Sequence, residues 1–275
     1  MVIEPRCAEE MRISLSLCRR AGVPCFVIGG GSNLLISDKG VPGAVIVTRK
    51  MRGITRHGGV LRVACGTPMP ALLRAFAAAG DNRLLFAAGI PGTVGGGLYM
   101  NAGTEGHGIA EMMESVCVVD GKTLDFKTLF LKECNISYRK TIFQTNSDQI
   151  VSADFPVRYI CAPEEIFAQI RKKLERRKAV QPLDFPNAGS VFKRHDSAVA
   201  LSRQLDELGL RGRRVGDAAV SEKLAGFIIN LGNATATDVV RLMREVQTIA
   251  ERSLGFCPEP EIRRIPDDDE FFNEG

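Results

Sequence analysis

The first segment that could carry chemistry is a run of three glycines, Gly29-Gly30-Gly31, followed by Ser32 and Asn33. Glycine accepts a positive φ and lets the backbone come close to a ligand. Successive N–H groups in such a turn form a nest that binds phosphate, and the two polar side chains add donors. Because the apolar stretch 25–28 comes directly before the glycines, the sequence favours a phosphate-binding loop at the end of a strand over a merely flexible turn.

A second glycine-rich loop spans residues 89–97, and neither loop fits a common nucleotide motif. The fingerprint G-x-G-x-x-G fails at Leu34 in the first loop and at Met100 in the second. A Walker-type loop would need glycine where Val116 stands, and no G-x-S-x-G elbow surrounds Ser32 or Ser190. These failures argue against Rossmann dehydrogenases, P-loop NTPases and serine hydrolases. Two such loops instead favour an extended diphosphate ligand lying across a different α/β scaffold.

The elements that must position these loops alternate between helix and strand in the first half of the chain. Apolar periodicity predicts helices over 8–21 and 70–79, and strands over 25–28, 44–47, 60–65, 115–119 and 150–159. A helix over 163–178 leads into the second half, where helices are expected over 197–208, over 221–230 and from Thr235 onward. Asp238 stands three residues after Thr235, which is the spacing of a capping box. The acidic tail 266–275 is expected to be frayed.

The composition is that of a globular protein with one large or two medium domains. The chain has 275 residues, 45% of them hydrophobic, and a net charge of +4 without a basic tract interleaved with aromatics, so nucleic acid is not an expected partner. Eight cysteines without a C-x-x-C pair and three histidines without ligand spacing predict no metal site and a reducing compartment. No signal peptide and no apolar run of roughly 20 residues is present, so we expect a cytoplasmic protein without a membrane partner.

Several motifs in a fixed order resemble the UDP-N-acetylenolpyruvoylglucosamine reductase family over nearly the whole chain. They are the glycine loops within 27–35 and 89–96, then 99–103, 138–139 with 143, 188–193, 215–218 through 225–228, and 260–263. The resemblance implies an α+β architecture, with a FAD-binding fold of the vanillyl-alcohol-oxidase (PCMH) type and a C-terminal substrate-binding domain. It implies a FAD-binding domain over 1–161 and a substrate-binding domain over 162–275, which begins with the linker helix.

The resemblance also implies FAD as cofactor, with NADPH and UDP-N-acetylglucosamine enolpyruvate as small-molecule partners, and we expect a monomer. The implied flavin-binding residues are Gly29, Gly30, Gly31, Ser32, Asn33, Leu34, Gly89, Pro91, Gly92, Thr93, Gly95, Gly96 and Asn101. The implied substrate-binding residues are Tyr138, Lys178 and Lys193, with Arg177 as plausible a diphosphate ligand as Lys178.

The catalytic residues that the resemblance implies are Arg139, Ser190 and Glu261. Hydride addition to an enolpyruvyl double bond leaves an enolate-like carboxylate, whose charge needs cationic or hydrogen-bonding partners. Arg139 and Glu261, the latter as a donor or through a neighbour, would supply them. The neighbouring carbon must then receive a proton, and Ser190 can provide it because the intermediate is a strong base. Each residue also has an ordinary structural alternative: a surface ion pair for Arg139, a turn of small residues for Ser190, and an exposed edge for Glu261.

The chain departs from the family pattern at several positions. Thr141 stands for serine, Glu105 for an aromatic residue, Leu224 for histidine, and Arg194-His195 for Asn-Pro. The family pattern also includes an upstream segment with its own Gly-Gly pair, and we expect a short N-terminal part here with an altered set of flavin contacts. Two rival functions stay open: another FAD-linked oxidoreductase of the same fold, and a non-catalytic nucleotide-binding relic.

Overall fold

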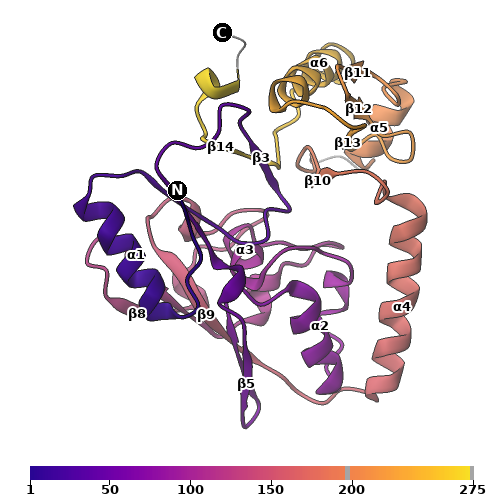
Figure 1. Ribbon diagram of the computed structural model, residues 1–275. Coiled ribbons are helices and arrows are strands. Elements are labelled where there is room, and N and C mark those ends of the chain that lie inside the picture. Colours follow the sequence, from indigo (N-terminus) through magenta and orange to yellow (C-terminus); the bar gives the residue numbers. More distant parts are fainter. Residues whose placement is uncertain (196–198, 273–275) are drawn as a thin grey trace. The chain divides into compact units, whose positions relative to one another are not determined.

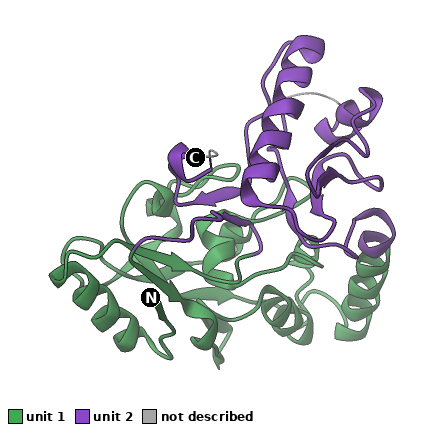
Figure 2. Ribbon diagram, turned by 45° about the horizontal axis from the view of Figure 1, so that its top comes forward, with its two compact units in different colours: residues 1–31, 43–175 green, residues 32–42, 176–275 purple. Residues whose placement is uncertain are grey.

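The computed structural model describes residues 1–195 and 199–272, which form two compact units. Unit 1 comprises residues 1–31 and 43–175, and unit 2 comprises residues 32–42 and 176–275. Figure 2 shows residues 32–42 in the colour of the C-terminal part, because this short excursion belongs to unit 2. Helix α4 (Pro163–Val180) begins in unit 1 and ends in unit 2.

Unit 1 contains two sheets. A parallel sheet has the strand order β1-β4-β2, and an antiparallel sheet has the order β5-β6-β9-β7-β8. The strands are β1 (Val2–Ile3), β2 (Cys25–Ile28), β4 (Ala44–Val47), β5 (Ile54–His57), β6 (Val60–Ala64), β7 (Ser115–Val119), β8 (Phe126–Phe130) and β9 (Gln149–Pro156). The predicted strands at 25–28, 44–47, 60–65, 115–119 and 150–159 are therefore confirmed within a few residues at their ends.

The helices of unit 1 pack on a core drawn from both halves of its chain. They are α1 (Ala8–Arg20), α2 (Met69–Ala78) and α3 (Val94–Tyr99), with short 3₁₀ turns η1 (Thr48–Lys50), η2 (Leu85–Ala87), η3 (Ile109–Met112), η4 (Leu131–Glu133) and η5 (Ile142–Gln144). Phe76 of α2 is fully buried and meets Phe155 of β9 edge-on, with ring centroids 6.2 Å apart. The first glycine loop leaves the end of β2, and the second follows η2.

Unit 2 contains an antiparallel sheet of order β10-β13-β12-β11 and a parallel pair, β14-β3. Its strands are β3 (Leu34–Ile36), β10 (Asn187–Ser190), β11 (Arg214–Val215), β12 (Ala218–Val220), β13 (Phe227–Asn230) and β14 (Arg263–Ile265). Its helices are α5 (Leu201–Glu207), α6 (Ala236–Leu254) and the 3₁₀ turn η6 (Asp269–Phe272). Figure 1 shows α6 beside β11 and β12, which it contacts.

Helix α6 begins where the capping box predicted. Thr235 accepts a hydrogen bond from the N–H of Asp238, and the Asp238 carboxylate accepts one from the N–H of Thr235. Asp38, from the excursion 32–42, accepts two further bonds from the N–H groups of Ala236 and Thr237 at 2.9 and 3.1 Å. All the leading donors of this helix are thus satisfied within unit 2.

Two predictions about unit 2 are wrong. The helix expected over 221–230 is a turn followed by β13, because the run Phe227-Ile228-Ile229 is buried on both faces and pairs with β12 and β10. A short buried apolar run carries no periodicity that separates strand from helix. The tail is also more ordered than expected: η6 forms over Asp269–Phe272, and Phe272 is 1% exposed. Residues 197–198 of the helix expected over 197–208 and residues 273–275 of the tail lie outside the described residues.

Among the described residues, no helix is long and apolar enough to cross a membrane. The same residues contain no cluster of three histidine, cysteine or acidic side chains arranged to hold a metal ion.

Candidate active site

The two glycine loops lie against each other in unit 1, backbone to backbone. A Cβ on Gly29 would stand 2.2 Å from the hydroxyl oxygen of Thr93, and a Cβ on Gly30 would stand 2.8 Å from the Cα of Gly92. A Cβ on Gly95 would stand 2.8 Å from the Cβ of Cys65. Side chains at Gly29 or Gly30 would therefore push the two loops apart, and one at Gly95 would push the second loop off Cys65, so these glycines are required by close approach rather than by flexibility.

The loops present backbone donors that the protein itself leaves unused. Within residues 1–195 and 199–272, the N–H groups of Gly30, Gly31 and Gly92 donate no hydrogen bond to another protein group. Gly31 has a φ of +75° and Gly92 a φ of +92°, and both Gly30 and Gly31 are exposed. Exposed donors on a side-chain-free surface fit the diphosphate of a dinucleotide, so the residues present suit FAD.

Burial raises the pKa of the Cys65 thiol, which lies under the second loop, to about 12. This cysteine is 2% exposed, and its carbonyl accepts a hydrogen bond of 2.7 Å from the N–H of Gly95. It therefore serves as a packing residue beneath the loop, because a thiol this weakly acidic is a poor nucleophile at neutral pH.

Arg139 occupies a two-residue turn in unit 1. Ser137 and Lys140 exchange backbone hydrogen bonds of 3.1 and 3.2 Å across it, which leaves Tyr138 and Arg139 at its tip. Arg139 has a φ of +55°, a region that side chains other than glycine, asparagine and aspartate seldom adopt. The guanidinium donates to the carbonyl oxygens of Asn101 and Gly103 at 3.2 and 2.8 Å, so backbone and side chain are both fixed.

Asn101, predicted to bind flavin, uses its side chain to support this turn. Its amide nitrogen donates to the carbonyl of Ser137 at 3.0 Å, and its amide oxygen accepts from the N–H of Ala110 at 3.2 Å. It is 5% exposed and has a φ of +42°. The carboxamide therefore joins the loop after α3 to the Arg139 turn.

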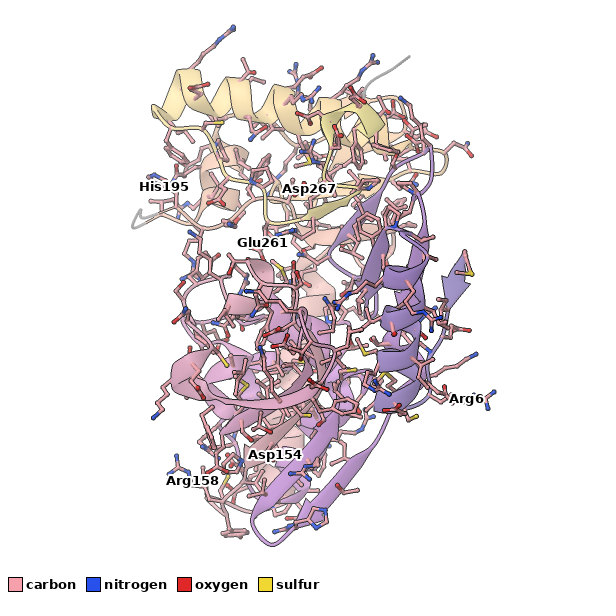
Figure 3. All side chains as sticks on the ribbon, turned by 90° about the vertical axis from the view of Figure 1, so that its left-hand side faces the viewer. Arg6, Asp154, Arg158, His195, Glu261 and Asp267 are labelled. Carbon is pink, nitrogen blue, oxygen red and sulfur yellow. The ribbon has the colours of Figure 1, made fainter. Side chains whose placement is uncertain are left out.

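Ser190 and Glu261 lie on neighbouring segments of unit 2. The N–H of Glu261 donates to the carbonyl of Val191 at 2.7 Å, and the N–H of Lys193 donates to the carbonyl of Glu259 at 2.8 Å. The Ser190 hydroxyl donates to the carbonyl of Phe192 at 3.3 Å. Figure 3 labels Glu261 on the segment that leads into β14. The fold of unit 2 thus brings together two of the three predicted catalytic residues, while Arg139 belongs to unit 1.

Asn33, the last residue of the first glycine loop, is hydrogen-bonded to the segment that carries Glu261. Its side-chain amide donates to the carbonyl of Glu261 at 3.1 Å, and its backbone carbonyl accepts from the N–H of Arg263 at 2.9 Å. Leu34, the next residue, pairs with Arg263 in the parallel ladder of β3 and β14. Sequence reasoning assigned Asn33 and Leu34 to flavin only and missed this link, because parallel pairing across most of the chain leaves no local pattern.

The basic residues predicted to contact substrate differ in environment. Lys193 forms an ion pair with the Glu259 carboxylate, and Lys178 is exposed. Arg177 is half-buried; burial lowers the pKa of its guanidinium, and its Nε donates to the side chain of Gln181 at 3.2 Å. The described contacts therefore keep both Arg177 and Lys178 as candidates for a phosphate ligand.

Comparison with known proteins places the chain in a family. Residues 1–123 match the model of the FAD binding domain, and residues 181–265 match that of the UDP-N-acetylenolpyruvoylglucosamine reductase, C-terminal domain. The chain is 39% identical over 265 residues to the UDP-N-acetylenolpyruvoylglucosamine reductase of Moorella thermoacetica, covering 95% of this chain and 85% of that protein. It is 36% identical over 264 residues to that of Synechococcus sp. (strain RCC307), covering 95% and 86%.

The chain belongs to the UDP-N-acetylenolpyruvoylglucosamine reductase family. The crystal structure of the reductase from Thermus caldophilus matches with a TM-score of 0.78 and 34% identity, covering 96% of this chain and 91% of that chain. The predicted fold class, a FAD-binding domain of the vanillyl-alcohol-oxidase type followed by a C-terminal domain, is confirmed, and FAD is the cofactor.

Three of the departures from the family pattern make side-chain contacts that account for them, at Thr141, Glu105 and His195. The Thr141 hydroxyl donates to the carbonyl of Tyr99 at 2.8 Å, a bond that serine could also make. Glu105 is exposed and pairs with Lys173 at 2.7 Å. His195 stacks on Phe256 with ring centroids 3.7 Å apart. Leu224 accepts from the N–H of Phe227 through its backbone carbonyl, in the turn before β13.

Proposed function

We propose that this chain catalyses the NADPH-dependent reduction of UDP-N-acetylglucosamine enolpyruvate to UDP-N-acetylmuramate, a step of peptidoglycan precursor synthesis. The observation that carries the proposal is the family relationship over 95% of the chain, at 36–39% identity to the reductases of Synechococcus and Moorella. The retained motif residues Arg139, Ser190 and Glu261 support it. Residues 1–161 act as the FAD-binding domain and 162–275 as the substrate-binding domain.

The two glycine loops would hold the FAD diphosphate through the free N–H groups of Gly30, Gly31 and Gly92. When bound, FAD supplies the redox centre that takes up hydride from NADPH and passes it on to the enolpyruvyl double bond. The chain's own task is to orient that double bond, to stabilise the charge that develops on its carboxylate, and to deliver one proton.

Arg139 stabilises the developing negative charge on the substrate carboxylate. Its guanidinium has five N–H donors, and its bonds to the carbonyl oxygens of Asn101 and Gly103 make it a fixed, planar cation rather than a mobile one. A preorganised cation of this kind stabilises charge without reorganising at the moment of reaction. Glu261 assists from unit 2, where its N–H donates to the carbonyl of Val191 and its carbonyl accepts from the side-chain amide of Asn33.

Ser190 delivers the proton to the carbon next to the carboxylate. Its hydroxyl hydrogen passes to that carbon as the C–H bond forms, and the resulting alkoxide recovers a proton from water, which reaches the exposed serine. The hydroxyl's resting partner is a single carbonyl at 3.3 Å, a weak bond that releases the proton easily. Lys193, and Arg177 or Lys178, bind the anionic part of the substrate.

The test is an anaerobic mixing experiment with the purified, FAD-loaded protein. NADPH alone should bleach the visible flavin absorbance, and subsequent addition of the enolpyruvyl substrate should restore it in the absence of oxygen. Recovery only on admitting oxygen would indicate an oxidase, and a protein that neither binds FAD nor bleaches would indicate a nucleotide-binding relic. We further propose that the protein is cytoplasmic and monomeric. Sedimentation velocity checks the monomeric state.

A further inference from the structure

The carboxamide of Gln144 bridges two backbone carbonyls in unit 1. This residue ends the 3₁₀ turn η5, and its Nε2 donates to the carbonyl of Tyr99 at 2.8 Å and to the carbonyl of Arg139 at 3.0 Å. An amide nitrogen has two hydrogens, so both are used. The bridge joins the last residue of α3 to the residue at the tip of the Arg139 turn.

The Tyr99 end of the bridge is firmly anchored. Its carbonyl also accepts a hydrogen bond of 2.8 Å from the Thr141 hydroxyl, and Thr141 is 4% exposed. Helix α3 begins at Val94 and is capped by Thr93, whose side chain accepts a bond from the N–H of Gly96, so the helix leads directly from the second glycine loop. The Tyr99 carbonyl is therefore held in one position relative to that loop.

The Arg139 end of the bridge is the part that needs support. A left-handed φ of +55° is unfavourable for arginine, and such a conformation persists only where the surroundings over-determine it. The cross-turn bonds of Ser137 and Lys140 hold the ends of the turn. The bond from Gln144 holds the peptide group of Arg139 itself, and so fixes the direction in which its side chain leaves the backbone.

We propose that Gln144 is a positioning residue for Arg139. It clamps the strained peptide to α3 and thereby sets the guanidinium where additional negative charge develops on the substrate carboxylate. This inference rests on the proposed function for its consequence in turnover. Its structural part, that the donor on Gln144 holds the turn, stands independently. A shift of about 1 Å in a catalytic group can cost on the order of 100-fold in rate.

The test uses two substitutions of Gln144 that remove the donors. Gln144→Met keeps the length of the side chain without a donor, and Gln144→Glu places a carboxylate against two carbonyl oxygens. Gln149→Met and Gln149→Glu serve as matched controls, because the side chain of the half-buried Gln149 donates only to the carbonyl of Ser147, two residues earlier in the chain, at 2.9 Å. All four proteins are compared with wild type at equal FAD content.

Hydrogen–deuterium exchange is the first measurement. Both Gln144 variants should exchange faster than wild type at the amides of residues 138–140, while the Gln149 variants should not. Rapid mixing is the second measurement. Reduction of the flavin by NADPH should change less than twofold, whereas its reoxidation by the enolpyruvyl substrate should slow by about 10- to 100-fold.

The pH dependence separates positioning from a general loss of structure. A glutamic acid facing two carbonyls has a raised pKa, because a protonated carboxyl can donate its one O–H to one of them and a carboxylate can donate to neither. The reoxidation rate of Gln144→Glu, relative to wild type, should therefore recover as the pH falls, whereas that of Gln144→Met should stay low. Unchanged exchange in both Gln144 variants would overturn the inference. Faster exchange with equal slowing of both half-reactions would overturn it as well, while a wild-type protein that the substrate never reoxidises would overturn the proposed function alone.

Discussion

The Arg139 turn of unit 1 and the Ser190 strand of unit 2 hold their functional groups in different ways. Arg139 is fixed by a strained backbone, by two carbonyls at its guanidinium and by Gln144 at its own carbonyl. Ser190 is exposed at the end of a short strand, and its hydroxyl makes one long bond to Phe192. The register of β10 against β13 also shifts between Asn187 and Ser190.

The difference fits the roles proposed for the two groups. A cation that stabilises developing charge works best when it does not move, so the protein accepts backbone strain to fix it. A proton donor must change partners during the reaction, so a weakly bound hydroxyl on an irregular strand end suits it. Substitutions that change either Arg139 or Ser190, and leave the other residue intact, therefore test this difference in how the two groups are held.

The largest effect is expected at Ser190. Ser190→Ala removes the proposed proton donor from an exposed position, so turnover should fall by about 10²–10⁴-fold while the melting temperature stays near that of wild type. Ser190→Cys should keep more activity, because a thiol can still donate a proton. Steady-state assays and thermal melts measure both, with Ser253→Ala on the exposed face of α6 as control. An inactive Ser190→Ala that also melts well below wild type would assign the serine a structural role.

The next effect is expected at Arg139. Arg139→Lys keeps the charge and the strained φ but loses the planar fork that binds two carbonyls, so turnover should fall by about 100-fold. Arg56→Lys, on the β5–β6 hairpin, should behave as wild type, because its Nε donates only to the nearby carbonyl of Gly58. Measured kcat and KM decide the outcome, and a lysine variant with full kcat would show that a mobile cation suffices.

Glycine loop packing should produce a smaller effect, on cofactor binding. Gly30→Ala places a Cβ 2.8 Å from the backbone of Gly92, which cannot swing aside, so stability should fall by about 1–3 kcal/mol and FAD should bind more weakly. Gly53→Ala is the matched control, since its Cβ would have nothing within 4 Å. FAD titration by flavin fluorescence gives the affinities. Equal FAD affinity for both variants would refute the close approach of the two loops.

The smallest effect is expected at the link between Asn33 and Glu261. Asn33→Leu removes a single donor from the Glu261 carbonyl, and a net hydrogen bond contributes about 1 kcal/mol, so the rate of flavin reoxidation should fall about tenfold or less. Asn233→Leu, an exposed asparagine of the same unit, provides the control. Stopped-flow reoxidation at saturating substrate measures it, and a variant as slow as Ser190→Ala would mean that Asn33 does more than hold Glu261.

The sequence predicted what depends on local patterns. Strand β2, the glycine loops and the start of α6 at Thr235 follow from apolar runs, from glycine at close approach and from a capping box, all within a few residues. The sequence also pointed to Arg139 and Ser190, although only through its resemblance to the reductase family. Their assigned roles remain predictions.

The rest depends on contacts between distant segments. The excursion 32–42 joins unit 2 through pairing of β3 with β14 and through Asp38 at the start of α6. The positive φ of Arg139 and the bridge from Gln144 appear only once η5 and the end of α3 are placed. The sequence predicted a helix over 221–230 where β13 forms, because a short buried strand carries no alternation of exposed and buried residues.

The most direct test of the account is rapid mixing of wild type and Ser190→Ala, with the two half-reactions followed separately by flavin absorbance. Bleaching by NADPH needs no proton from the serine, so both proteins should bleach at similar rates. Recovery on adding the enolpyruvyl substrate needs hydride and proton together, so it should slow by about 10²–10⁴-fold in Ser190→Ala alone. Equal slowing of both phases, or of neither, would contradict the assignment of Ser190 as the proton donor.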